Sequence, residues 1–346
     1  MKKKIIVAPL NWGLGHASRC VPIINALLEN NYIPVIASDG NALGFLKQEF
    51  PDLENLELPS YHISYGKNIK LKLLLKLPKI RKSVKEENNI INNFIKANKD
   101  VVGVISDNRF GVRSSSIPSV YLTHQINVLS GFTTFFTSYI HQKIIHKFDE
   151  CWIPDNLNSE FSGKLSSNKK NLNAKFIGVL SRFKKAELEK TIDVLVIISG
   201  PEPNRTLIEN KLISVFKNDS RNIVFVLGKV VNHQKKWNKE NILFYNYLLT
   251  KELQKLINAS KVIVCRSGYS SIMDLAVLQK KVFLIPTKNQ PEQEYLARYL
   301  EKKGIAPYAE IENFSKEKVL EVEKHKGLKV DETQFNHQLF SLFKRK

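Results

Sequence analysis

The sequence predicts an α/β protein with two domains, each a doubly wound parallel β-sheet covered by helices. Two observations carry this prediction. Short β-branched runs alternate with helical segments, and the alternation starts again after a polar, charged stretch in mid-chain. Parallel strands need helical crossovers, so such alternation is typical of parallel sheets. The 346 residues also allow two separate cores, and we expect two Rossmann-like sheets that face each other across a cleft.

The N-terminal half contains the first alternation. Its strand candidates are Lys4–Leu10, Ile33–Ser38, Leu56–Pro59, Val101–Ser106, Pro118–Leu122 and Phe148–Ile153, and its helix candidates are Cys20–Leu28, Asn41–Phe50 and Asn88–Asn98. The short strand candidate Lys175–Leu180 precedes the charged stretch Lys184–Lys190, where we place the domain junction. We therefore expect domains at 1–180 and 181–332, with a C-terminal helix at about 333–346 that can pack back on the first.

The C-terminal half contains the second alternation. Its strand candidates are Asp193–Ser199, Asn222–Leu227, Ile242–Tyr245, Lys261–Cys265 and Lys281–Ile285. Its helix candidates are Thr206–Phe216, Lys251–Ala259, a segment that opens at Arg266–Ser271 and runs to Leu278, and Glu292–Lys303. Polar residues directly after these strands are site candidates, because doubly wound folds bind ligands at the carboxyl edge of the sheet.

The formal net charge of +20 leaves three kinds of partner open: nucleic acid, an anionic membrane surface and anionic small substrates. Eight of the cations lie in Lys67–Lys85, which contains no acid and seven Leu or Ile residues. Such a segment can bind acidic lipids through its cations and leucines, or it can be a solvated basic face over a core-facing stripe. Pro78 should divide it into two short helices or kink one.

The three cysteines, Cys20, Cys151 and Cys265, are too few and too far apart for a disulfide framework or a structural zinc site. Met1–Leu10 starts with cations but lacks the uninterrupted apolar run and cleavage site of a signal peptide. No segment has the apolar length needed to span a bilayer. A reducing cytoplasm is therefore the expected location.

The turn after the first strand contains two glycines, Gly13 and Gly15, followed by His16. Glycines let the backbone approach a ligand, and the helix N-terminus that follows suits a phosphate or another anion. Two alternatives stay open. A dinucleotide-binding turn would use Asp39 for the ribose but would need a glycine where Ser18 stands, and a plain tight turn would leave His16 as an ordinary surface residue.

Further polar residues follow strands at the same predicted edge. Asp107 comes directly after Val101–Ser106, and His124 follows Pro118–Leu122, with Asn127 shortly after it. His16 and His124 therefore follow different strands at one edge, which makes Asp107 and His124 site candidates beside His16. For Asp107 an ordinary helix cap or turn is the alternative.

The segment after Lys261–Cys265 places hydroxyl groups at a helix N-terminus. Ser267 and Gly268 open the helix, and Ser270 and Ser271 lie in its first turn, an arrangement that suits phosphate oxygens. Asp274 lies four residues after Ser270, on the same side of the helix, at a reach suited to ribose hydroxyls.

Gln293 and Glu294 open the next helix at the same edge, where an amide and a carboxylate can bind sugar hydroxyls. Asp274 alone would be an ordinary solvated helix residue. Together with its neighbours it favours a nucleotide site.

These segments resemble a known donor-site signature, that of glycosyltransferase family 28. The residues that carry the resemblance are Ser267–Gly268, Asp274–Ala276, Pro286, Gln293–Tyr295 and Glu301–Ala306. The family includes the N-acetylglucosaminyltransferase of the lipid-linked peptidoglycan precursor and the galactolipid synthases. The resemblance implies the two-domain GT-B fold, a nucleotide ribose held at Asp274 and a donor sugar held at Gln293. More loosely, Gly13–His16 and His124–Asn127 are similar to the family's acceptor-side loop and its histidine segment.

The resemblance implies an inverting transfer from a nucleotide sugar, expected to be a UDP-sugar, to a hydroxyl acceptor. His16 is the expected base, Asp107 or His124 can orient it or bind acceptor, and Gly13, Gly15 and Asn127 belong to the acceptor or phosphate loop. Gly131–His146 can be core or acceptor-facing surface. No metal and no cofactor beyond the substrate are expected, since no Asp-x-Asp pair or ligand cluster occurs. Helix N-termini and Arg205 or Arg266 would then balance the leaving group's charge.

The sequence also departs from the family. The N-terminal loop has fewer glycines than that of the family, and Gln125 stands where the family has an acid. The resemblance therefore does not identify the acceptor of this protein. In the turn at 199–205 two prolines donate no N–H group, which leaves Ser199, Asn204 and Arg205 to bind phosphate.

Two other functions therefore stay open. Gly13–Cys20 is also similar to the start of the nucleotide-sugar hydrolases of nonulosonic acid biosynthesis, which transfer the sugar to water. The basic charge alone would fit a non-enzymatic binder of nucleic acid or of a membrane surface, but no nucleic-acid module is recognisable and no nucleic-acid partner is expected. A lipid-linked acceptor of the cell envelope and a peripheral position on the inner membrane face, reached through Lys67–Lys85, complete the expectation.

Overall fold

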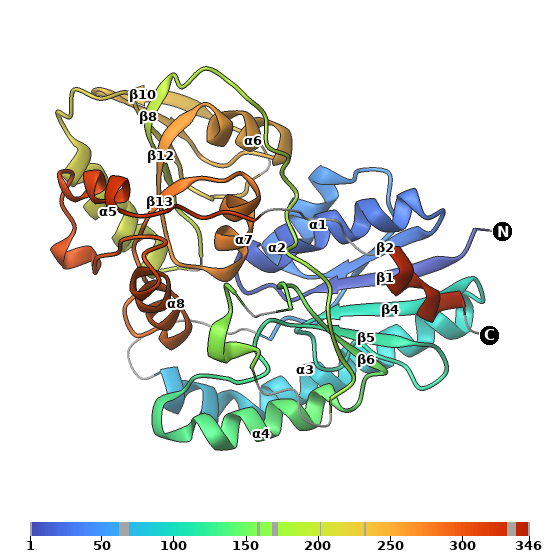
Figure 1. The fold of residues 1–346 in the computed structure, drawn as a ribbon. Helices are drawn as coiled ribbons and strands as arrows, with labels where there is room; N and C mark the ends of the chain where they lie inside the picture. The colour runs from blue at the N-terminus through green and yellow to red at the C-terminus, as the bar shows by residue number, and fades with distance from the viewer. Residues whose placement is uncertain are drawn as a thin grey trace. The chain divides into compact units, whose positions relative to one another are not determined.

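The computed structural model describes residues 2–61, 69–157, 160–167, 172–200, 202–231, 233–330 and 337–344. The chain divides into two compact units (Figure 1). Unit 1 comprises Met1–Leu180 and Gln334–Lys346, and unit 2 comprises Ser181–Thr333. Each unit contains one β-sheet with helices on its faces.

The sheet of unit 1 has the strand order β3-β2-β1-β4-β5-β6-β7, and all its pairings are parallel. Its strands are β1 Lys4–Pro9, β2 Ile33–Ser38, β3 Asn55–Glu57, β4 Val101–Asp107, β5 Ser119–Leu122, β6 Glu150–Ile153 and β7 Ala174–Phe176. The helices are α1 Leu14–Glu29, α2 Gly40–Glu49, α3 Ile69–Ala97 and α4 Thr134–Ile145, with short 3-10 helices η1 Gly131–Thr133 and η2 Gly163–Leu165.

The sheet of unit 2 has the strand order β10-β11-β9-β8-β12-β13. Its strands are β8 Ile192–Ile197, β9 Ile223–Val226, β10 Lys236–Lys239, β11 Ile242–Tyr245, β12 Ser260–Cys265 and β13 Lys281–Leu284. Its helices are α5 Asn204–Phe216, α6 Thr250–Asn258, α7 Tyr269–Val277 and α8 Pro291–Lys302, with 3-10 helices η3 Ile311–Asn313 and η4 Lys318–Lys324. The pairings are parallel except at the edge, where β10 runs antiparallel to β11.

The predicted fold class is confirmed: both units are α/β with doubly wound parallel sheets. The prediction succeeded because the strands are buried on both faces, and strands of this kind have continuous apolar sequences. In β1 the four residues from Ile5 to Ala8 are fully buried. In unit 2, Phe216, Phe225 and Phe283 lie in one core that joins α5 to the sheet.

The segment after unit 2 belongs to unit 1, and the C-terminal helix expected there is a 3-10 helix, η5 His337–Lys344. Phe340 and Phe343 are buried, with ring centroids 6.2 and 6.3 Å from that of Trp152 on β6. A Cβ at Gly103 on β4 would collide with the ring of Phe343, so β4 needs a glycine there. In Figure 1 this segment, in dark red, lies beside the strands of unit 1.

Pro78 lies inside α3, whose assigned helix is continuous from Ile69 to Ala97. The expectation of two short helices was wrong, and only the single-helix alternative stays compatible with the structure. Of the basic segment 67–85, residues 67 and 68 lie outside the described part, as do the side chains of 69–77. In the part of the chain that the structure describes, no helix is long and apolar enough to cross a bilayer.

Candidate functional site

The strand order of unit 1 reverses between β1 and β4, so the loops that follow these two strands leave the sheet toward opposite faces. Doubly wound sheets bind ligands at such a switch point, outside the carboxyl ends of the strands. His16 follows β1, Asp107 is the last residue of β4, and His124 follows the neighbouring β5. The three residues predicted as catalytic therefore lie at one edge of one sheet.

The turn between β1 and α1 depends on a glycine for its backbone conformation and on an asparagine for its hydrogen bonds. Gly13 precedes the helix with φ of 86°, a conformation that other residues rarely adopt. The Asn11 amide donates to the Asp39 carboxylate at 3.0 Å and accepts from the backbone N–H of Ala42 at 3.3 Å. Asp39 also binds Arg109 at 2.7 Å. This acid is engaged within the protein, which argues against the dinucleotide-binding alternative.

The catalytic candidates meet around Arg19, a residue that the sequence analysis did not single out. Its Nε donates to Asp107 Oδ2 at 2.6 Å, its second terminal nitrogen, Nη2, donates to Asp107 Oδ1, and Nη1 lies 3.0 Å from His124 Nδ1. His16 Nδ1 lies 2.9 Å from the same Asp107 Oδ1. The signal for Arg19 was its spacing, since residues three apart on α1 share a helix face with His16.

The cluster of Arg19, Asp107, His124 and His16 is deeply buried, and His16 is its one partly exposed member. Asp107 has no exposed surface, Arg19 and His124 are buried, and the His16 side chain is 15% exposed. Burial alone would raise the pKa of Asp107, but the charges of Arg19 and His16 and their hydrogen bonds hold it at about 2. Asp107 is therefore an acceptor-only carboxylate at neutral pH.

The remaining acceptor-side residues have different surroundings. Gly15 lies in the first turn of α1. Asn127 donates from its side chain to the carbonyl of Lys164 at 2.7 Å, and its backbone N–H donates to that of Leu165 at 2.8 Å. Asn127 thus anchors the loop around η2 to the segment that follows β5.

Unit 2 has its own switch point, between β8 and β12, and the predicted donor-side residues gather there. Arg266, after β12, donates to the backbone carbonyl of Ser199, after β8, and lies 3.4 Å from the side-chain oxygen of Gln290. Gly200 has φ of 97°, and a Cβ there would collide with the Arg266 guanidinium. The structure thus brings Ser199 and Arg266 together.

The start of α7 is built from Ser267 to Ser271. Gly268 is its N-cap residue and supplies no side-chain cap, and Ser270 and Ser271 form its first turn. Ser267 Oγ donates to the backbone carbonyl of Gln293 at 2.8 Å, which joins this helix start to α8. The N-terminus of α7 therefore has the backbone N–H groups and the hydroxyl groups that suit a phosphate.

Gln293 is nearly buried, and its side-chain oxygen accepts from the N–H and hydroxyl of Thr287 at 3.0 and 2.9 Å. These bonds fix the amide, and its Nε2 lies 3.9 Å from the point where a Cβ on Gly268 would be. Glu294 accepts from the N–H of Asn289 at 2.8 Å and so stabilises the turn before α8. Of the two, Gln293 borders the helix start of α7.

Asp274 lies on α7, one turn after Ser270. Ser181 Oγ donates to its Oδ1 at 2.7 Å. Burial raises the pKa of Asp274 to about 6, against the opposing effects of Arg182 and Ser181. An acid whose pKa lies this close to neutrality can change its charge when a ligand donates hydrogen bonds to it.

Arg205 is not placed as expected. Its guanidinium is buried at the start of α5 and bound by Glu202 and Glu209, three residues before it and four after it. Both carboxylates occupy the donors that were expected to bind phosphate, so the structure assigns Arg205 to an ion-pair network. Asn204 is the first residue of α5 and keeps its place at a helix N-terminus. Residue 201 of this turn lies outside the described residues.

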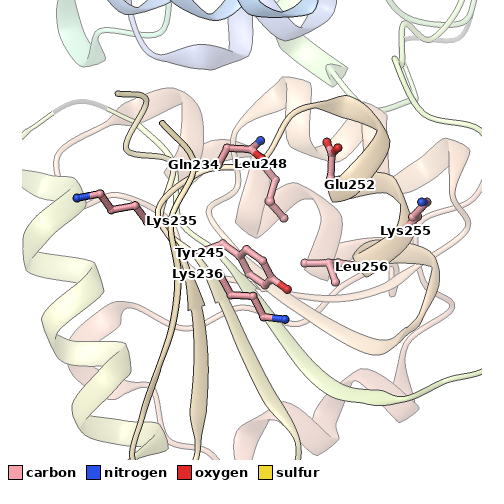
Figure 2. A pocket seen from close by; sticks show the side chains of 8 residues that line it. All are labelled: Gln234, Lys235, Lys236, Tyr245, Leu248, Glu252, Lys255 and Leu256. Atoms are coloured by element: carbon pink, nitrogen blue, oxygen red, sulfur yellow. The ribbon is translucent and has the colours of Figure 1, made fainter. Parts of the chain in front are cut away.

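Unit 2 also has a hollow of about 400 Å³ between α6 and the β10–β11 hairpin, which the sequence analysis missed (Figure 2). It is lined by Gln234, Lys235, Lys236, Tyr245, Leu248, Glu252, Lys255 and Leu256. It contains none of the predicted donor-side residues. Across the ranges that the structure describes, no group of three or more His, Cys, Asp or Glu residues could hold a metal ion.

Solved structures with the same architecture identify the fold. The chain is similar to the glycotransferase of kitacinnamycin, with a TM-score of 0.62 and 13% identity over 92% of this chain and 90% of that one. MurG of Acinetobacter baumannii gives a TM-score of 0.55 with 12% identity over 99% and 93%. The spinosyn rhamnosyltransferase SpnG complexed with thymidine diphosphate gives 0.59 with 11% identity over 99% and 92%. The chain therefore has the GT-B fold of two-domain glycosyltransferases.

A family model matches the C-terminal part of the chain. Residues 194–338 match the model of the glycosyltransferase family 28 C-terminal domain. The resemblance seen in the donor-site motifs is thus confirmed for this segment of the chain. A comparison with curated proteins gives no significant match.

Proposed function

We propose that the protein transfers a sugar, with inversion and without a metal, from a nucleotide sugar to a hydroxyl acceptor. The acceptor oxygen attacks the anomeric carbon, the bond from that carbon to the diphosphate oxygen breaks, and the acceptor proton goes to His16 Nε2. The observation that carries this proposal is the contact of His16 Nδ1 with Asp107, because a carboxylate on one ring nitrogen leaves the other as a base.

We assign the donor to unit 2. The N-terminus of α7 and the Arg266 guanidinium would balance the charge of the leaving diphosphate, Asp274 would accept hydrogen bonds from the ribose, and Gln293 would bind the sugar. The family 28 match supports this placement, since it covers all these residues. The relative solved with thymidine diphosphate supports a nucleotide-linked donor, and a UDP-sugar is the donor we expect.

The test is release of nucleoside diphosphate from a panel of nucleotide sugars, with and without added acceptor. Transfer predicts release that depends on the acceptor and a glycosylated product. Release that is equally fast without acceptor, with free sugar as the product, would instead assign the hydrolase activity. Unchanged release in the presence of EDTA is expected for the metal-independent reaction.

We further propose that the acceptor is borne on a lipid and that unit 1 docks on an anionic membrane. Four large apolar side chains of α4 face solvent: Phe135 is 87% exposed, Phe136 64% and Tyr139 50%, with Ile140 also exposed. Aromatic side chains with polar surroundings are suited to the headgroup region of a bilayer. The described cations of α3, namely Lys79, Arg81, Lys82 and Lys85, are exposed as well.

The loop after β4 connects these two helices. The Phe110 ring lies 6.2 Å from that of His141 on α4, and a Cβ at Gly111 would meet Val84 and Glu87 of α3. Apolar and basic groups are thus available in one region of unit 1, the combination that binds acidic lipid.

A further inference from the structure

The side-chain amide of Gln293, in the first turn of α8, is held so that only one of its two polar ends can face a ligand. We propose that Thr287 is a positioning residue that keeps the NH2 group of this amide toward the donor sugar, so that the protein selects a sugar group that accepts a hydrogen bond there and rejects an amino group. The inference rests on the proposed function, since that function places the sugar at Gln293.

The backbone N–H of Thr287 decides the orientation of the amide. Its nitrogen lies 3.0 Å from the side-chain oxygen of Gln293, and the Thr287 hydroxyl lies 2.9 Å from the same oxygen. The hydroxyl can donate or accept, but the backbone N–H can only donate. A reversed amide would turn its NH2 group toward this N–H, so the oxygen must face Thr287 and Nε2 must face away from it.

Burial makes this orientation hard to leave. Only 7% of Gln293 and 3% of Thr287 are exposed, and a polar group that loses its partner in such surroundings costs free energy. The loop around Thr287 is itself fixed, because the backbone N–H of Gln290 donates to the carbonyl of Thr287 at 3.1 Å. Thr287 is therefore a rigid support for the amide.

The NH2 group of Gln293 lies beside the start of α7. Nε2 is 3.9 Å from the position of a Cβ on Gly268, the N-cap residue of that helix. Among the residues that the structure describes, none accepts a hydrogen bond from Nε2. A nearly buried amide with an unused donor, next to a helix N-terminus that suits phosphate, indicates a ligand with a hydrogen-bond acceptor close to its phosphate.

A contact that can only donate separates sugar groups by their chemistry. A hydroxyl or a carbonyl oxygen can accept from Nε2, whereas a protonated amino group has only donors. An amino group, or a hydrogen in place of the hydroxyl, would leave Nε2 without a partner, and the altered ligand would bind more weakly. Nucleotide sugars with a free amino group at this position should therefore be rejected.

Calorimetry with the intact protein tests this selection without turnover. The probes are the tightest binder among UDP-glucose, UDP-galactose and UDP-N-acetylglucosamine, and its analogues with one sugar substituent replaced by hydrogen or by an amino group. For wild type we expect one position at which both replacements weaken binding about tenfold or more. Equal affinity for the amino analogues at every position would overturn the proposal. If none of the three UDP-sugars binds, the proposed function fails together with this inference.

Gln293→Glu is the variant that reverses the contact. A carboxylate accepts from Thr287 with one oxygen, as the amide does, and turns a second acceptor toward the sugar. At the selected position the amino analogue should now bind about tenfold better than the hydrogen analogue. Amino analogues at the other positions control for the added charge and should gain less. An unchanged order of affinities in Gln293→Glu would reject Gln293 as the selecting group.

Thr287→Val and Thr287→Ser separate positioning from stability. Valine has a similar shape but no hydroxyl, so the amide is held by one bond and the preference for the parent sugar over the amino analogue should fall about threefold. Serine keeps the hydroxyl and should keep the wild-type preference. If Thr287→Val lowers the free energy of unfolding but retains the full preference, Thr287 has only a structural role and the proposal is rejected.

Discussion

A histidine that is held by a carboxylate on one side and is partly open on the other has the arrangement of a general base. If His16 is that base, His16→Ala should lower kcat by about 10² to 10⁴, because the acceptor proton loses its receiver. Nucleotide-sugar affinity should change little, since the donor is assigned to unit 2. Initial rates and calorimetry on the same preparations would measure both quantities.

The matched control is His146→Ala, which removes an exposed histidine at the end of α4. Its turnover should equal that of wild type. A His16→Ala enzyme that also retains normal turnover would contradict the assignment and shift the role to Asp107 or His124.

Asp274 predicts a pH dependence of donor binding. With its pKa raised to about 6, the free protein carries a largely neutral carboxyl at pH 5 and an ionised one at pH 7. Ribose hydroxyls bind the ionised form better, so affinity should fall about tenfold as the pH drops from 7 to 5. The ligand for calorimetry is an intact UDP-sugar, because its diphosphate diester does not titrate in this range.

Asp274→Asn is the control, since it keeps the shape of the side chain and removes the titration. Its affinity should be weaker at pH 7 and should not vary between pH 5 and 7. An equally steep pH dependence in this variant would place the titrating group elsewhere.

At the scale of elements, α3 and α4 predict a salt-sensitive attachment of unit 1 to membranes. Each cation near an anionic surface contributes about 1 kcal/mol, so four cations are enough for reversible binding. A variant with Lys79, Arg81, Lys82 and Lys85 changed to Gln should sediment less with anionic vesicles than wild type. High salt should reduce binding of the wild type because the charges are screened.

Two comparisons separate docking from general charge. Phe135→Ser with Phe136→Ser should weaken binding without changing net charge. The matched charge control changes four exposed lysines of unit 2 to Gln: Lys211, Lys302, Lys324 and Lys326. If this control loses as much binding as the α3 variant, the attachment is a property of net charge and α3 has no special role.

The elements also show how far the sequence could be interpreted. The buried strands and the helices α2, α5, α6, α7 and α8 were predicted within a few residues, because continuous apolar runs and helical periodicity come from burial itself. The helix α4 was not predicted. The edge strand β10 was missed, because Lys236–Lys239 is fully exposed and has no apolar pattern. Arg205 was misplaced, although acids three residues before and four after it were visible in the sequence.

The site was predictable in part for a related reason. Residues that follow strands, such as His16, Asp107 and Asp274, could be placed at a sheet edge from their position alone. Arg19 could not, because its role comes from contacts with residues 88 and 105 positions away. Its spacing of three from His16 indicates only a shared helix face, and the long-range pairing itself leaves no local pattern in a single sequence.

At the scale of the whole molecule, the packing of η5 on unit 1 predicts a substitution that strongly lowers the stability of unit 1. Phe343 is fully buried against Gly103, and Trp152 lies close to its ring. Phe343→Ala should therefore cost about 3 to 5 kcal/mol, the range for removing a buried aromatic side chain. Denaturant unfolding would measure the loss.

Leu320→Ala is a suitable comparison, because this large side chain of unit 2 is mostly exposed and should cost little. UDP-sugar affinity of Phe343→Ala should equal that of wild type at denaturant concentrations where unit 1 remains folded. A Phe343→Ala protein as stable as wild type would mean that η5 contributes nothing to the core of unit 1.

The packing of the C-terminal η5 on unit 1 also has a consequence for biosynthesis. During translation the ribosome synthesises all of unit 2 before it adds the residues of η5. Unit 1 therefore lacks Phe340 and Phe343 while the whole second domain is being made. Until then Trp152 and Gly103 expose the surface that Phe340 and Phe343 later cover. A released chain that ends at residue 333 should therefore have a folded second domain and an incomplete first one, the reverse of the usual order in which N-terminal domains fold first.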